Sequence, residues 1–126
     1  MKRIYFAAAF LLITISLAIF ESYYIGKQTD NFILKIEQSD NSMKEKNSKE
    51  TYNNIKKIKH QWEENVWTFE IMIHNDNTDK ITQNLASLAV YAEKGNIDEY
   101  ISSSEKIKEQ LTSLKESELL TLKNIL

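Results

Sequence analysis

The chain has 126 residues, of which 42% are hydrophobic and 27% charged, with 16 Lys and Arg against 18 Asp and Glu. This length allows one apolar anchor and one domain of roughly 100 residues with a modest core. The chain contains no Cys, which excludes disulfides, thiolate nucleophiles and zinc sites of the cysteine type. The formal net charge of −2 lacks the basic excess typical of nucleic-acid binding, so we expect no nucleic-acid partner.

The N-terminal residues 1–25 are predicted to be a membrane anchor. Apolar or weakly polar residues run without interruption from Ile4 to Phe20, directly after Lys2 and Arg3. As a helix this run spans roughly 25 Å, slightly less than the ~30 Å hydrocarbon core of a bilayer. A basic pair stays on the cytoplasmic side, which predicts a single-pass protein of the cell membrane with a cytoplasmic N-terminus and an extracytoplasmic domain.

A cleaved signal peptide begins with the same pattern of basic and then apolar residues. The small residues that a cleavage site needs, Ser16 and Ala18, lie inside the apolar run, and the residues after it include bulky Tyr23 and Tyr24. The sequence therefore favours an uncleaved anchor.

Residues 26–47 are expected to form a stalk helix followed by a polar loop. Phe32, Ile36 and Met43 keep a weak helical period, whereas residues 39–49 are almost wholly polar. Gly26, where the chain leaves the anchor, is the natural place for a bend.

Residues 48–126 are expected to form the bundle core. Pro is absent and Gly occurs only at positions 26 and 95, so helices can run on with few sharp turns. Apolar residues step by three and four along a first helix that Asn47 and Glu50 can cap, and along two further helices separated at Gly95. The three stripes are Tyr52, Ile55, Trp62, Val66, Phe69 and Ile73; Ile81, Leu85, Leu88 and Ala92; and Ile97, Tyr100, Ile101, Ser104, Ile107, Leu111 and Leu114.

The short connection at Gly95 predicts that the last two helices fold back as an antiparallel hairpin. The segments Lys46–Glu50 and Gly95–Glu99 stand at the same offsets from the apolar residues that follow them, which raises the possibility of a duplicated helical hairpin.

The close of the chain, residues 118–126, is too apolar for a free tail, and we expect it to dock on the bundle. The fold class is thus all-α, with a single N-terminal transmembrane helix followed by an antiparallel bundle of three to four helices.

Several of these features together resemble a known family. The basic start and apolar helix, the helix with Trp62 and Trp67 that runs into Phe69 and His74, the helix that ends at Gly95, and the close at residues 118–126 look like the domain-of-unknown-function family numbered 4363. The resemblance spans nearly the whole chain. It implies a small, membrane-anchored protein of low-GC Gram-positive bacteria, and it implies no activity, cofactor or catalytic residue.

Two residues are candidates for contacts with a partner or ligand. Trp67 lies one step off the apolar stripe, where it either covers the edge of the core or stands exposed as an interface anchor. His74 lies near the expected end of its helix, where the imidazole ring can bond free carbonyl groups, and a ligand or metal near it is the alternative. His60 is too far from His74 along one helix to share a metal with it, and can pair locally with Glu63 or Glu64.

The sequence contains no Gly-rich phosphate loop, nucleophile elbow or metal-ligand cluster. We therefore expect that the protein is not an enzyme and binds no cofactor. The favoured interpretation is a membrane-anchored interaction or scaffold module in the cell envelope with an unidentified protein partner. The alternative is a ligand- or metal-binding helical domain that uses a pocket near His74.

Overall fold

The computed structural model describes residues 1–72 and 77–125, without the side chains of residues 71, 72 and 125. Within these ranges the chain forms four helices and no strand. They are α1 (Lys2–Lys44), α2 (Ser48–Met72), α3 (Asn77–Lys94) and α4 (Ile97–Ile125). The prediction of an all-α protein with one long apolar N-terminal helix and an antiparallel bundle is confirmed.

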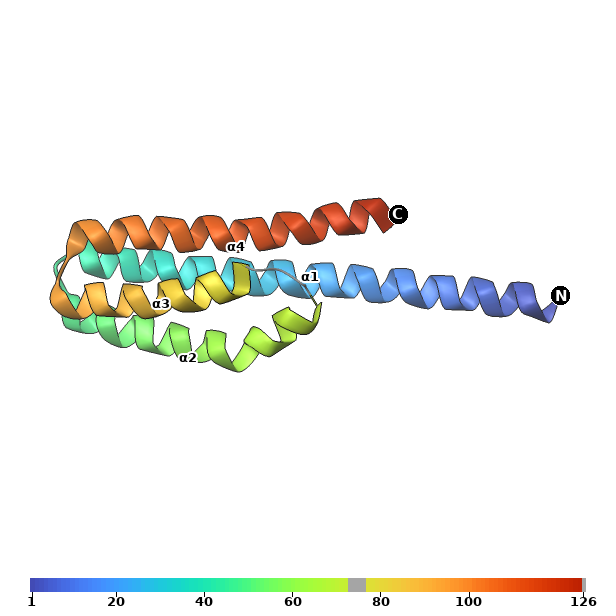
Figure 1. The fold of residues 1–126 in the computed structure, drawn as a ribbon, viewed down its shortest axis with the longest axis horizontal. Helices are drawn as coiled ribbons and strands as arrows, with labels where there is room; N and C mark the ends of the chain where they lie inside the picture. Colours follow the sequence, from blue (N-terminus) through green and yellow to red (C-terminus); the bar gives the residue numbers. More distant parts are fainter. Residues whose placement is uncertain (73–76, 126) are drawn as a thin grey trace.

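The helices run alternately up and down in a four-helix bundle (Figure 1). α1 packs against α2 and α4, and α3 packs against the same two neighbours, so the helices form a closed ring in cross-section. The turns after α1 and α3 lie at one end, which we call the distal end. The end of α2 and the start of α3 lie at the opposite, proximal end, where α1 leaves the bundle and continues alone to the N-terminus (Figure 1).

The buried positions of the two long helices explain why they pack side by side. They follow each other at alternating steps of three and four residues, an average of 3.5 that keeps one face of a helix turned toward its neighbours over many turns. In α1 these positions are Ser22, Ile25, Thr29, Phe32, Ile36, Ser39 and Met43, with Asp40 buried in addition, and in α4 they are Tyr100, Ser104, Ile107, Leu111, Leu114 and Glu118.

Trp62 joins three helices at the centre of the core. Its fully buried ring meets Phe32 of α1 edge-on at a centroid distance of 5.4 Å and stacks on Phe69 of α2 at 5.2 Å. The indole N–H donates a hydrogen bond of 2.8 Å to the hydroxyl of Thr82 on α3. The core position expected for Trp62 is confirmed.

The segment expected to be a stalk and a loop is instead part of the bundle. α1 is a continuous helix through Gly26 and ends only at Lys44, so the expected bend and most of the expected loop are wrong. The buried positions of this segment include Thr29, Ser39 and Asp40, and these polar residues hide its periodicity from a search for apolar stripes. The bundle accordingly has four helices, with α1 as the fourth.

Both distal turns end a helix in the same way. Gly95 has φ +71°, its N–H donates to the carbonyl of Ala92, and the next N–H, of Asn96, donates to Tyr91. After α1, Lys46 has φ 63° and makes the corresponding bond to Met43, while Asn47 donates to Ser42. This is the Schellman arrangement, which satisfies free carbonyls at a helix end. Such turns are common at helix ends, so the duplicated hairpin stays a prediction.

Candidate functional site at the proximal end

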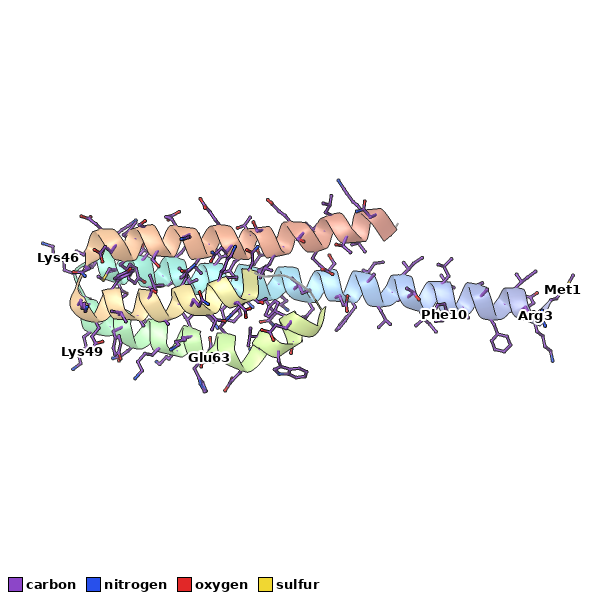
Figure 2. The ribbon with its side chains drawn as sticks, in the orientation of Figure 1. Met1, Arg3, Phe10, Lys46, Lys49 and Glu63 are labelled. Atoms are coloured by element: carbon purple, nitrogen blue, oxygen red, sulfur yellow. The ribbon has the colours of Figure 1, made fainter. Side chains whose placement is uncertain are left out.

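Large apolar side chains remain exposed along α1 before it enters the bundle. Residues 4–20 lie in α1, and Phe10, Ile13 and Leu17 are each at least 60% exposed. Figure 2 shows Phe10 projecting from the part of α1 that no other helix accompanies, and Arg3 near the N-terminal end of that helix. This stretch, which we call the apolar segment, is long and apolar enough to cross a membrane. α1 carries it into the bundle without a break.

The C-terminal turns of α4 leave two leucines in solvent near the bundle end of this segment. Leu119 is 47% and Leu120 is 61% exposed, whereas Leu122 is half-buried. The expectation that the close of the chain docks on the bundle is therefore only partly met. The reason is that α2 and α3 are shorter than α1 and α4 (Figure 1), so the last turns of α4 have α1 as their main neighbour.

A groove of about 540 Å³ runs between these two helices. Its apolar wall is formed by Ile19 and Tyr23 of α1 and by Leu119 and Leu122 of α4. Farther along, the Lys115 ammonium pairs with the Asp30 carboxylate at 3.0 Å. A groove that is apolar at one end and charged at the other can accept a molecule with an apolar part and a polar part.

A buried carboxyl lies close to this groove. Glu118 is 8% exposed, and the structure gives it no hydrogen bond or ion pair within the described ranges. Burial raises the pKa of its carboxyl above the ordinary value, and the negative charge of Glu21 raises it further. The charged form of this acid is therefore destabilised by its surroundings.

Trp67 points away from the core. It lies near the end of α2 at the proximal end and is 61% exposed. This exposure agrees with the second interpretation of the residue, and its role as an interface anchor stays a prediction. An exposed Trp offers a large contact area with little loss of side-chain freedom, which suits it to an interface.

The second candidate residue, His74, lies outside the described residues, and so does the pocket expected near it. Among the residues that the structure describes, no three His, Asp or Glu side chains are grouped to hold a metal ion. His60 is exposed, and its Nε2 lies 2.8 Å from the Glu64 carboxylate. The local pairing expected for His60 is confirmed.

Sequence reasoning missed a polar cluster in the α1–α4 interface of the distal half. Asp40 accepts hydrogen bonds from the Ser104 hydroxyl at 2.6 Å and from the Lys108 ammonium at 3.0 Å. Although burial lowers the pKa of Lys108, its bonds to Glu105 and Asp40 raise it by more. Burial, and then the charge of Asp40, raises the pKa of the Tyr100 hydroxyl. The signal was Ser104 on an otherwise apolar stripe.

Fold and site together define a class: a four-helix bundle whose first helix extends into a long apolar segment. A family model described as Domain of unknown function (DUF4363) matches residues 19–125, and the chain belongs to that family. The match begins within α1 near the end of the apolar segment and covers all four helices of the bundle. Neither curated proteins nor solved structures include a match to the chain.

Proposed function

We propose that this protein is a membrane-anchored interaction module of the cell envelope, with the apolar segment in the membrane and the bundle outside the cytoplasm. The observation that carries this proposal is the continuity of α1 from Lys2 to Lys44. A helix without a hinge joins the bundle rigidly to the anchor and sets its height above the membrane, which suits a scaffold. Lys2 and Arg3 before the segment support a cytoplasmic N-terminus.

The proposed partner is a protein, and Trp67 is its proposed point of contact. Trp67 is the one Trp on the bundle surface, since Trp62 is buried. Exposed Trp residues are enriched among the side chains that contribute most to protein association. The proposal assigns a binding role and no catalytic one, because the sequence offers no nucleophile or phosphate motif.

The absence of Cys from the chain allows a direct test of topology. Lys106→Cys places one thiol on the exposed face of α4, and Lys2→Cys places one before the apolar segment. In intact cells a membrane-impermeant maleimide should label the first variant and not the second, while both label after permeabilisation. Labelling of Lys106→Cys only after permeabilisation contradicts the orientation.

A photo-crosslinking amino acid at position 67 tests the partner contact in the full chain. We expect a discrete protein adduct on irradiation of cells. The matched control places the same amino acid at His60, an exposed position on the same helix, and should give no such adduct. The same pattern of products from both positions contradicts a partner site at Trp67.

A further inference from the structure

We infer that the C-terminal turns of α4 form a second contact with the membrane, in which Leu119 and Leu120 enter the interfacial layer beside the anchor. This inference rests on the proposed membrane location of the apolar segment. It assigns a lipid surface as the occupant of an apolar face that the bundle leaves uncovered.

The pairing of α1 with α4 sets the height of these leucines. The hydrogen bond between Asp40 and Ser104 fixes the register of the two antiparallel helices. Both helices rise by the same amount per residue, so about twenty residues from this bond Asn124 lies level with Phe20. The groove that Leu122 shares with Ile19 and Tyr23 agrees with this register. The last turn of α4 therefore ends where the apolar segment ends.

The distances match the dimensions of a bilayer. Leu120 lies level with Tyr24, about 6 Å beyond Phe20 along the helix axis. The headgroup layer on each side of a membrane is roughly 5 to 7 Å thick. The apolar segment is also about 5 Å shorter than the hydrocarbon core, so a bilayer that keeps Lys2 and Arg3 at its far surface reaches beyond Phe20. Both effects bring lipid to the level of Leu120.

The side chains around this point fit an interfacial position. Tyr23 is 68% exposed on α1 at the same height, and Tyr is enriched where a membrane meets water. Lys123 is exposed in the last turn of α4, where its ammonium can reach the headgroups while its stem stays among apolar groups. The contact would hold α4 and α1 to one surface and limit the tilt of the bundle.

The experiment uses the full chain in phosphatidylcholine–phosphatidylglycerol vesicles with a nitroxide spin label on one introduced Cys. Leu120→Cys tests the inference, Leu17→Cys reports on the anchor, and Val90→Cys is an exposed apolar control on α3. Collisions with oxygen report lipid, and collisions with a water-soluble nickel chelate report water. We expect the oxygen-to-nickel ratio at position 120 to exceed that at position 90 severalfold, and to lie below that at position 17.

Each other outcome overturns the inference in a distinct way. A lipid signal at position 17 with a water signal at position 120 contradicts the second contact and leaves the anchor intact. A water signal at position 17 contradicts the anchor itself, and with it the basis of the inference. Low accessibility to both reagents at position 120, or spin–spin broadening, would show that protein or a second copy covers the leucines instead of lipid.

Discussion

The distal and proximal ends of the bundle are built from the same four helices but differ in how much apolar surface they leave exposed. At the distal end two Schellman turns close the hairpins, and the Asp40 carboxylate has both a hydroxyl and an ammonium partner. At the proximal end Trp67 and Leu120 stand exposed, and the buried acid Glu118 lies near Glu21. Exposed large apolar side chains are typical of contact surfaces, so this difference is what the proposed contacts of the proximal end rest on.

The largest effect is expected from the two Trp residues of α2, which compare the core with the proximal surface. Trp62→Ala should lower the free energy of unfolding by about 3 to 5 kcal/mol, because it removes the ring between Phe32 and Phe69 and leaves a cavity. Trp67→Ala should change it by less than about 0.5 kcal/mol, because the side chain is mostly in water. Chemical unfolding of the full chain in detergent micelles, followed by circular dichroism, measures both. Equal losses would mean that Trp67 belongs to the core.

The next largest effect is expected at the polar cluster of the distal half. Asp40→Asn removes the negative charge from a bonded pair with Lys108 in a largely buried place. Hydrogen bonds to charged groups typically contribute about 1.5 to 3 kcal/mol, and we expect a loss of this size. The double variant Asp40→Asn with Lys108→Met is the control, and it should recover part of the loss if the pair is coupled. A loss from the double variant equal to the sum of the single losses would show that the two groups act independently.

The turns of the distal end should respond in opposite directions to matched changes. Gly95→Ala places a side chain at φ +71° and should cost about 1 to 2 kcal/mol. Lys46→Gly relieves the same strain at φ 63° and should add about 0.5 kcal/mol, since the greater freedom of Gly in the unfolded chain offsets part of the gain. Thermal unfolding compares both variants with the parent. A loss of stability from Lys46→Gly would contradict the equivalence of the two turns.

The smallest effect is expected from the buried acid of the proximal end. The pKa of Glu118 is raised in the folded state. Its charged form therefore lowers the stability of the fold, an effect that is absent below the unfolded pKa of about 4, grows as the pH rises and is complete above the raised pKa. Glu118→Gln should therefore stabilise the protein at neutral pH, and the gain should disappear as the pH falls toward 4. Unfolding curves across this range measure the difference. A gain that is independent of pH would show that charge is not its cause.

The sequence by itself determined the elements with strong local signals. The uninterrupted apolar residues before Glu21, the three-and-four spacing around Trp62 and Leu88, and Gly95 between two periodic segments each predict their structure without knowledge of the fold. A helix face must be apolar to be buried, and a left-handed helix end favours Gly, so these patterns can be read directly.

Only the tertiary structure decided the role of residues whose environment comes from a distant segment. Thr29 was expected in a stalk, and Ser39 and Asp40 in a polar loop, but the packing of α1 against α2 and α4 buries all three, and α4 supplies the groups that bond Asp40. Leu119 and Leu120 looked like core, but α2 and α3 end too soon to cover them. Burial depends on which helices lie alongside and how far each one extends, and residue type alone does not contain that information.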